Sequence, residues 1–462
     1  MSQPVDKKIE DIDADTNSDK FAQLVAEEQN HDIKFRTLSW QKTAFLLLTE
    51  YICLAMLALA WSYMVLGWVA AIGVTLLLSV STWYTSYVCW QYCMKHPHVR
   101  DIVDIALQLS GGNKFVGEAT AVMLILNNVF LMGFHVLTGS KILNTLTDHS
   151  QCTAVFQVIT AIVCFIFSLP RTLNQVSLMG VLSSLAMGIA MLLTLIYSGI
   201  QDHPGYGYDG NWPTAGATVV TTALPMATTF IAGTNAVLNI TFLFIGQILY
   251  PSFIAEMKNP KDFPKALAVL TVAEIIVFFI AASVGYAYNG QYSTAPLIGS
   301  LEQGWMKKSA FAFVIIPTVV IGVLYANVAG KFIFRRIIKD SIHGYTHTVY
   351  GWSIWTVIQA LLWGVSFLLG ETIPSMGDFL SLMSAAFDSF FGYIFWSLAW
   401  FQLNKGNYFS TPRQTIYFVI NATIFLLGLF MLGPGLYTSM EAIIADYSGP
   451  TNPAFSCHDN SL

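Results

Sequence analysis

Three ionisable side chains interrupt long apolar runs of the sequence and are the first candidates for chemistry. They are His135, Glu274 and Asp388. An unpaired charge at the middle of a membrane costs at least about 2.5 kcal/mol, so an ionisable residue there is a candidate for carrying a proton or an ion. Because histidine titrates near neutral pH, His135 is the first candidate for proton coupling, ahead of Glu274 and Asp388. A neutral histidine that hydrogen-bonds a neighbouring helix is the open alternative.

Other charged residues near the apolar runs have a simpler explanation. Glu50, Glu118, Lys141 and Glu256 lie close to the ends of these runs, where long side chains reach the aqueous interface. The sequence has no GxxxxGK[ST], HExxH or GxSxG motif, and its six cysteines show no paired CxxC spacing. We therefore predict no enzyme activity, no metal or other cofactor, and no nucleic-acid partner.

One apolar run, TNAVLNITFLFIGQILYPSFIAEM, contains a glycine that predicts a local break in a helix. Gly246 lies between two apolar halves, with Gln247 beside it and Asn239 further upstream. Glycine lowers the cost of unwinding a helix. Secondary transporters bind substrate near the membrane midplane, where broken helices expose main-chain polar groups. For a lone glycine the alternative is close packing against another helix.

The elements that must position these residues are predicted membrane helices. Of the 462 residues, 55% are hydrophobic and 11% are charged, whereas an average soluble domain has about 25% charged residues. A helix needs about 20 mainly apolar residues to cross a bilayer. Runs of this kind occur at 44–66, 68–93, 116–143, 153–169, 176–200, 223–250, 266–288, 309–334, 350–370, 378–403 and 413–436. The sequence thus predicts an all-α integral membrane protein with about 11 transmembrane helices.

The distribution of positive charge orients these helices. Lys and Arg are enriched in the cytoplasmic loops of membrane proteins. With the N-terminus in the cytoplasm, only Lys141, Lys307 and Lys308 of the 22 Lys and Arg residues fall outside. This predicts a largely disordered cytoplasmic tail over 1–42, a transmembrane domain over 43–436 and an extracellular tail over 437–462. Cys152 and Cys457 would share the outer face, where a disulfide is chemically permitted.

Several segments resemble one family of transporters. The stretch GQILYPSFIAEMKNPKDFPKAL, from Gly246 to Leu267, resembles the sixth helix and following loop of the amino acid/auxin permease family. LNTLTDHSQCTAVF and CFIFSLPRTLNQVS resemble the third-to-fifth-helix region of its fungal branch, the neutral amino acid permeases associated with methyltryptophan resistance. HPHVRDIVDIALQLSGG and YAYNGQYSTAPLIGSL also match, so the resemblance covers residues 36–436.

The resemblance implies a fold and a binding site. The fold would be the five-plus-five inverted repeat of the amino acid–polyamine–organocation superfamily, with an extra C-terminal helix. Substrate would lie between unwound segments of helices one and six, held by free backbone groups and helix N-termini. Members of this branch are generally proton-coupled. The implied substrate-contacting residues are Leu54, Ala55, Met56, Leu57, Ala58, Leu59, Phe244, Ile245, Gly246 and Gln247, with Asn127 and Asn128 of helix three.

Helix one departs from the family pattern E-x-x-x-x-G-x-L-S-x-P. The sequence EYICLAMLALA places Ala55 where the family has Gly and Ala60 where it has Pro. In soluble helices, replacing Gly by Ala stabilises the helix by about 1 kcal/mol and replacing Pro by Ala by about 3 kcal/mol. We therefore expect helix one to unwind less readily than in relatives.

Taken together, these features predict a secondary active transporter that carries neutral, aromatic or aliphatic amino acids with protons across the plasma membrane. Its partners would be the amino acid, protons and membrane lipid. Two alternatives stay open. One is an amino acid sensor that keeps the fold with weak or no transport, and the other is a transporter of a non-proteinogenic amino acid.

Overall fold

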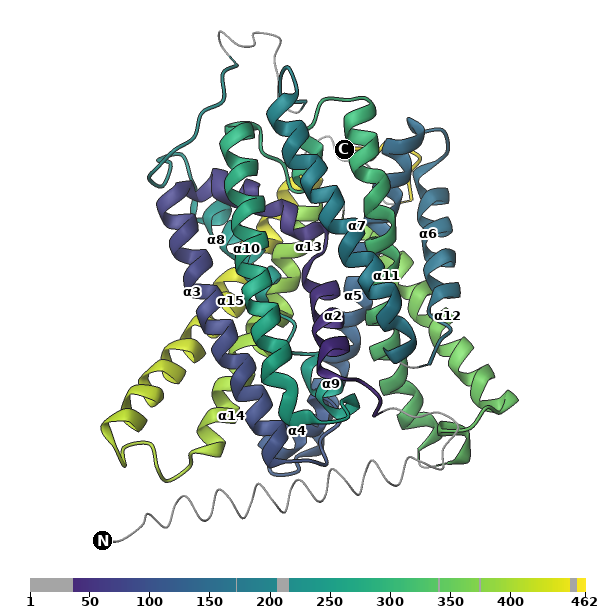
Figure 1. Cartoon of the computed structure of the whole chain (residues 1–462), viewed down its shortest axis with the longest axis vertical. Coiled ribbons are helices and arrows are strands. Elements are labelled where there is room, and N and C mark those ends of the chain that lie inside the picture. The colour runs from purple at the N-terminus through teal and green to yellow at the C-terminus, as the bar shows by residue number, and fades with distance from the viewer. Residues whose placement is uncertain (1–35, 172, 206–215, 340, 374, 449–454) are drawn as a thin grey trace.

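A computed structural model describes residues 36–171, 173–205, 216–339, 341–373, 375–448 and 455–462 (Figure 1). Within these residues all regular elements are helical. The α-helices are α2 Trp40–Tyr51, α3 Leu59–Lys95, α4 Ile102–Leu109, α5 Lys114–Thr147, α6 Thr153–Phe167, α7 Leu173–Ile200, α8 Phe230–Phe244, α9 Tyr250–Glu256, α10 Phe263–Asn289, α11 Trp305–Ile338, α12 Val349–Thr372, α13 Met376–Met383, α14 Phe395–Leu403 and α15 Pro412–Ser448. Short 3-10 helices, among them η2 Leu54–Ala58 and η5 Leu297–Ser300, and the π-helix η7 Ser384–Ile394 complete the bundle.

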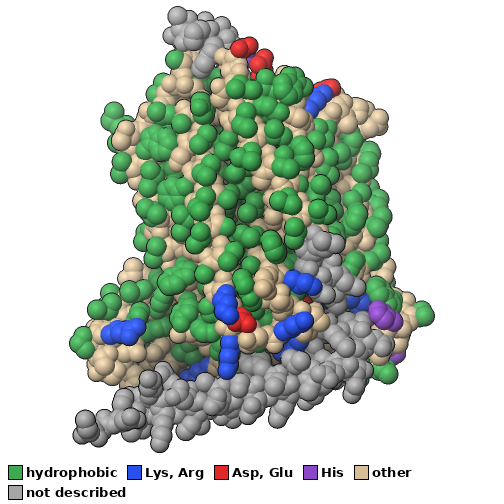
Figure 2. Space-filling view, in the orientation of Figure 1, with side chains coloured by type: hydrophobic (Ala, Val, Ile, Leu, Met, Phe, Trp, Pro, Cys, Tyr) green, Lys and Arg blue, Asp and Glu red, His purple; other side chains and the backbone are tan. Residues whose placement is uncertain are grey.

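The long helices run between two ends of the molecule (Figure 1). We call them the upper end, which carries the turn between α5 and α6, and the lower end, which carries α4 and α9 (Figure 1). Between them the surface is a belt of hydrophobic side chains (Figure 2). Exposed leucines and valines such as Leu77, Leu185, Val272 and Leu361 belong to this belt. Because helices satisfy their own backbone hydrogen bonds, such a surface is stable against lipid.

The helices of the described residues correspond to the predicted spans. Eight are long and apolar enough to cross a membrane, and Thr153–Phe167 and Phe230–Phe244 are shorter apolar helices. The longest candidate, Leu54–Lys95, contains the second part of the predicted crossing 44–66 and all of the predicted crossing 68–93. The two crossings meet at Gly67. There φ is 71°, and an added Cβ would lie 2.3 Å from the Ala223 carbonyl oxygen, so glycine permits both the turn and the close approach.

Three crossings are interrupted, and all three interruptions fall at mid-bundle. Helix one comprises α2, η2 and the start of α3, and its backbone is non-helical at Ile52 and Cys53. Helix six comprises α8 and α9, with Ile245 in extended conformation between them. Helix ten widens from α13 into the π-helix η7 before continuing as α14. π-Helical turns are rare and are frequent at functional sites.

The break in helix one lies upstream of the two alanines that replace the family residues. Ala55 and Ala60 favour helix, yet the helix is interrupted upstream of both, at Ile52 and Cys53. Ala55 lies in the 3-10 turn η2 and Ala60 in the first turn of α3. Packing offers a reason for the small side chain at position 60, because a Cβ added to Gly285 of α10 would lie 3.0 Å from the Ala60 Cβ. Both alanines therefore lie in helical segments, as their propensity favours, and a lower readiness of helix one to unwind stays a prediction.

At the C-terminal end of the chain the structure extends beyond the predicted boundary. Helix α15 continues past residue 436 to Ser448. Residues 455–462 lie against the upper end, where Cys152 and Cys457 form a disulfide with an S–S distance of 2.00 Å. Residues 1–35 of the predicted N-terminal tail lie outside the described residues.

Candidate functional site

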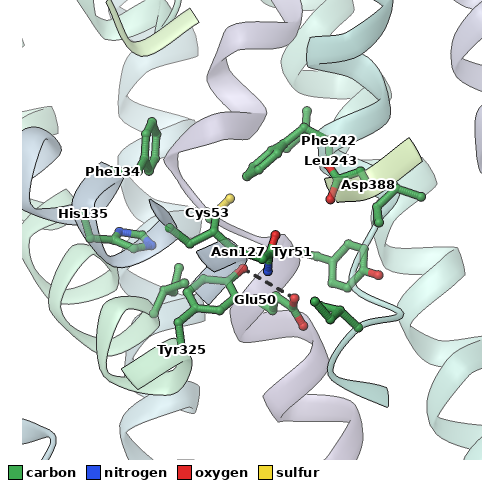
Figure 3. A pocket seen from close by; sticks show the side chains of 14 residues that line it. Glu50, Tyr51, Cys53, Asn127, Phe134, His135, Phe242, Leu243, Tyr325 and Asp388 are labelled. Carbon is green, nitrogen blue, oxygen red and sulfur yellow. Dashed lines mark hydrogen bonds between the residues drawn. The ribbon is translucent and has the colours of Figure 1, made fainter. Parts of the chain in front are cut away.

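A buried cavity lies at mid-bundle, where the interrupted helices meet (Figure 3). Its volume is about 30 Å³. It is lined by Glu50, Tyr51 and Cys53 of helix one, Asn127, Leu131, Phe134 and His135 of α5, Phe242, Leu243, Ile245 and Ile248 of helix six, Ile321 and Tyr325 of α11, and Asp388 of η7. A space of this size holds only a water molecule or two. An amino acid would therefore enter only if the surrounding helices moved apart.

The breaks in helices one and six touch each other through Gly246. A Cβ added to Gly246 would lie 2.6 Å from the Tyr51 hydroxyl oxygen and 2.9 Å from Glu50 Oε1. The Tyr51 hydroxyl also lies 2.5 Å from the Tyr250 hydroxyl, which belongs to the first turn of α9. Glycine is required at position 246 because the side chains of helix one fill the space in which a Cβ would stand.

Gln247 holds the break in helix six against α3. Its Oε1 accepts a hydrogen bond from the Gly246 N–H at 3.0 Å. Its Nε2 donates to the Thr82 carbonyl, to the Thr85 hydroxyl and to the Ser86 hydroxyl at 3.1 to 3.3 Å. Gln247 therefore replaces part of the hydrogen bonding that an uninterrupted helix would supply.

Two carboxyl groups and an imidazole line the cavity. Glu50, Asp388 and His135 are 6%, 8% and 6% exposed. The Tyr325 hydroxyl donates to Glu50 Oε1 at 3.4 Å, and the Tyr325 ring stacks on His135 with centroids 6.2 Å apart. Among the described residues, Glu50 Oε2, Asp388 Oδ2 and His135 Nδ1 have no hydrogen-bond partner. None of the described lining residues is Lys or Arg.

Sequence reasoning did not identify Glu50 as part of this site. We expected it to reach the aqueous interface because it stands near the start of an apolar run, but it is buried at the cavity. A signal was present, since Glu50 is the acidic residue that opens the helix-one pattern before the break. Glu256 is buried as well and pairs with Lys331, whereas Glu118 pairs with Arg336 at the surface.

The remaining predicted site residues divide into two groups. Ile245, Asn127, His135 and Asp388 line the cavity. Buried but absent from its lining are Leu54, Ala55, Met56, Leu57, Ala58, Leu59, Phe244, Gly246, Gln247, Asn128 and Glu274. Asn128 instead donates to the Leu124 carbonyl at 2.7 Å within its own helix. Glu274 lies in α10 with Oε1 unpartnered among the described residues.

The lower end is closed by a second polar cluster. Lys331 Nζ of α11 lies 2.6 Å from Glu256 Oε1 at the end of α9, and both side chains are buried. The Leu38 carbonyl accepts a hydrogen bond from the Lys258 N–H, and the Leu38 N–H donates one to the Glu256 carbonyl. Asp101, which caps α4 nearby, faces the same cluster. Burial raises the pKa of Asp101 to about 6.

Helix ends and side chains at the cavity suit binding rather than bond-breaking chemistry. The break in helix six ends α8 and begins α9, so carbonyl groups of one and N–H groups of the other face mid-bundle. Such termini favour a cation and an anion respectively. The described residues contain no cluster of three His, Cys, Asp or Glu side chains that could hold a metal ion.

The sequence is similar to those of known proteins. The sequence profile described as transmembrane amino acid transporter protein matches residues 36–440. An N amino acid transport system protein of Neurospora crassa is 27% identical over 436 residues, which cover 93% of this chain and 90% of the relative. A transmembrane transporter of Gibberella moniliformis is 26% identical over 442 residues, which cover 95% and 91%.

One solved structure shows the same fold at low sequence identity. A nucleobase-cation-symport-1 family transporter, in a closed conformation with bromovinylhydantoin bound, matches with a TM-score of 0.53 and 15% identity. The match covers 91% of this chain and 96% of that chain. It confirms the predicted fold class, an all-α integral membrane protein with a five-plus-five inverted-repeat transporter core and an additional C-terminal helix.

Proposed function

The chain belongs to the transmembrane amino acid transporter family, and on that premise we propose that it is a secondary active transporter for neutral, aromatic or aliphatic amino acids that moves them together with protons. The observation that carries this proposal is the cavity between the breaks of helices one and six, which is lined by Glu50, Asp388 and His135. Main-chain polarity and titratable side chains meet there at mid-bundle, as substrate and coupling ion require in this type of fold.

The other lining side chains favour a neutral substrate with an apolar side chain. Leu131, Phe134, Phe242, Leu243 and Ile321 present aliphatic and aromatic surface to the cavity. Each Å² of apolar surface removed from water contributes about 25 cal/mol of favourable free energy, so binding of a large hydrophobic side chain would be favoured there. The carbonyl end of α8 would favour the α-amino group, and the N-terminus of α9 would favour the α-carboxylate.

Protons are the coupling ion that this chemistry supports. A buried carboxylate without a cationic partner carries a desolvation cost of several kcal/mol. Either a proton or the ammonium group of the substrate would remove that cost. Glu50 and Asp388 line one cavity, so one carboxyl could take the proton while the other receives the ammonium group. The proposed orientation has the lower end in the cytoplasm and the upper end outside, at the plasma membrane.

Uptake into proteoliposomes with an imposed pH gradient tests this proposal. A gradient of one pH unit stores about 1.4 kcal/mol, so one proton per substrate supports about tenfold accumulation. We expect radiolabelled leucine or phenylalanine to accumulate under that gradient and to leak out when a protonophore collapses it. Accumulation that follows a sodium gradient and ignores pH would refute proton coupling, and absence of any flux would favour a sensor.

Replacing Glu50 tests the role of the cavity carboxyl. The Glu50→Gln variant keeps the shape and the hydrogen bond with Tyr325 but cannot exchange a proton. We expect it to bind or exchange amino acid while losing accumulation driven by the pH gradient. The matched control is Glu118→Gln, whose surface carboxylate pairs with Arg336. Proton-driven accumulation by Glu50→Gln equal to that of the control would contradict the assignment.

A further inference from the structure

Residues 455–462, which we call the C-terminal strap, are fixed to the upper end of the bundle. The disulfide between Cys152 and Cys457 links the strap covalently to the residue that precedes α6. The next residue is held as well, because the Thr153 hydroxyl donates to the His458 carbonyl. The strap therefore follows a defined path over the N-terminus of α6.

Asn460 of the strap inserts among polar side chains of α5. Its Oδ1 accepts from Asn144 Nδ2 at 2.6 Å, and its Nδ2 donates to the Ser140 hydroxyl at 3.1 Å. Lys141 Nζ donates to the backbone carbonyl oxygen of Asn460 at 3.5 Å. Ser140, Lys141 and Asn144 are all buried. Buried polar groups in a membrane protein require partners, and the strap supplies them.

Lys307 connects the strap to the loop between α10 and α11. Its side chain is only 1% exposed, and its Nζ donates to the Leu462 carbonyl oxygen at 3.0 Å and to the Gly299 carbonyl oxygen at 3.2 Å. Gly299 belongs to η5, the 3-10 turn of that loop. Gln303 adds a bond to the Leu462 carbonyl oxygen at 3.1 Å. The Lys307 ammonium group is thus hydrogen-bonded to both the strap and the loop.

The loop held in this way reaches the site. The η5 turn packs against η2 of helix one. Leu297 of η5 lies close to Gly285 of α10, which in turn packs on Ala60 at the start of α3. Contacts therefore run without a gap from the strap through Lys307 and η5 to the interrupted part of helix one, next to Cys53 of the cavity.

We propose that the upper ends of α5, α6 and α11 form a docking site for the chain's own C-terminal strap, and that docking holds η5 against helix one and restricts access to the cavity from the upper end. The docking site consists of Ser140, Lys141, Asn144, Thr153 and Lys307 with Cys152 as covalent anchor. Releasing the strap would leave Lys307 with the Gly299 carbonyl alone, loosen the contact between α11 and η5, and expose the cavity more often.

Thiol labelling of Cys53 measures this exposure directly. Cys53 is a free, buried cysteine that lines the cavity. The protein would be purified into nanodiscs, treated with a water-soluble maleimide, and the modification of Cys53 followed by peptide mass spectrometry. The assay needs neither substrate nor orientation, so its result is independent of the proposed transport function.

Three variants release the strap in different ways. Asn460→Ala removes the side-chain hydrogen bonds to Asn144 and Ser140 of α5. Lys307→Gln removes the bonds to η5 and the strap, and the double variant Cys152→Ser/Cys457→Ser removes the covalent anchor without adding a thiol. We expect Asn460→Ala and Lys307→Gln to label Cys53 about tenfold faster, which corresponds to about 1.4 kcal/mol lost from the docked state. The control is Lys308→Gln, because Lys308 pairs with Asp148 instead of the strap.

The outcomes separate the proposal from a purely structural role. Thermal unfolding in the same nanodiscs verifies that each variant is folded, and Asn460→Ala keeps the test decisive if Lys307→Gln does not fold. Faster labelling in Asn460→Ala and in the double serine variant, with Lys308→Gln unchanged, supports the proposal. Unchanged or slower labelling in folded Asn460→Ala and double serine variants overturns it.

Discussion

Replacing Gly246 by alanine perturbs the contact between the two broken helices at its centre. The new Cβ would lie 2.6 Å from the Tyr51 hydroxyl oxygen, 2.9 Å from Glu50 Oε1 and 2.9 Å from Tyr51 Cε2. Distances below about 3 Å require a neighbour to move. The Tyr51 hydroxyl is hydrogen-bonded to Tyr250 and the Glu50 carboxylate to Tyr325, so moving either side chain would disturb a hydrogen bond. Overpacking at such a place costs about 1–3 kcal/mol.

This cost falls on the closed arrangement of the site, so it sets the expected size of the effect. A loss of 1.4 kcal/mol is a factor of ten in an equilibrium. We therefore expect Gly246→Ala to lower the rate of amino acid uptake by about five- to 140-fold. The control is Gly188→Ala in α7, where an added Cβ meets nothing within 4 Å. Initial uptake rates, normalised to folded protein in the membrane, provide the measurement.

A double variant shows whether the contact itself is responsible. Tyr51→Phe removes the oxygen that lies nearest to the new Cβ but leaves Tyr51 Cε2 and Glu50 Oε1 in place. Gly246→Ala/Tyr51→Phe should therefore recover part of the activity, with a coupling energy of about 0.5–3 kcal/mol between the two sites. Uptake by Gly246→Ala equal to that of Gly188→Ala would refute the reasoning, as would purely additive effects of the two changes.

The remaining predictions concern the supports of the site. Gln247→Leu removes the hydrogen bonds to α3 and should lower stability by about 1–3 kcal/mol, seen as a lower unfolding temperature in detergent; an unchanged temperature would contradict its role. Lys331→Met should cost about 3–5 kcal/mol because it leaves buried Glu256 unpaired, whereas Lys331→Met/Glu256→Gln should recover most of that loss in the same assay. Asp101 has a folded pKa of about 6 against an ordinary 3.8, so between these values the unfolded chain loses a proton that the folded protein keeps, and stability falls as pH rises. Asp101→Asn retains a helix cap and should flatten the unfolding temperature over this pH range; an unchanged slope would assign the dependence to another group.

Local sequence patterns were sufficient for the architecture. The eleven apolar runs, the interruption at Gly246 and the family resemblance each depend on neighbouring residues only, and the helices and the fold class agree with them. The same patterns identified Asn127, His135, Ile245 and Asp388, which line the cavity. Intramembrane polar residues are costly, so their presence in an apolar run is informative without knowledge of the fold.

Other features were decided by contacts between segments that are far apart in the chain. Glu50 is a cavity residue because α8 and α11 close over the end of α2, and the helix-one break lies at Ile52 and Cys53, upstream of Ala55 and Ala60. Gln247 points to α3, away from the cavity, because three polar groups of that helix receive it. Helix periodicity predicts none of these three features.

The sequence alone determined that this chain crosses a membrane many times and where one helix breaks, because hydrophobic length and glycine act locally. Only the tertiary structure decided which polar groups meet. The covalent and polar docking of residues 455–462 on α5, α6 and α11 is the clearest case. Cys152 and Cys457 are 305 positions apart in the sequence, and Ser140 and Asn460 are 320 apart. Lys307, which bonds Leu462, belongs to a third helix, α11. Whether a buried polar group finds a partner depends on packing in three dimensions, and that is a property of the whole fold.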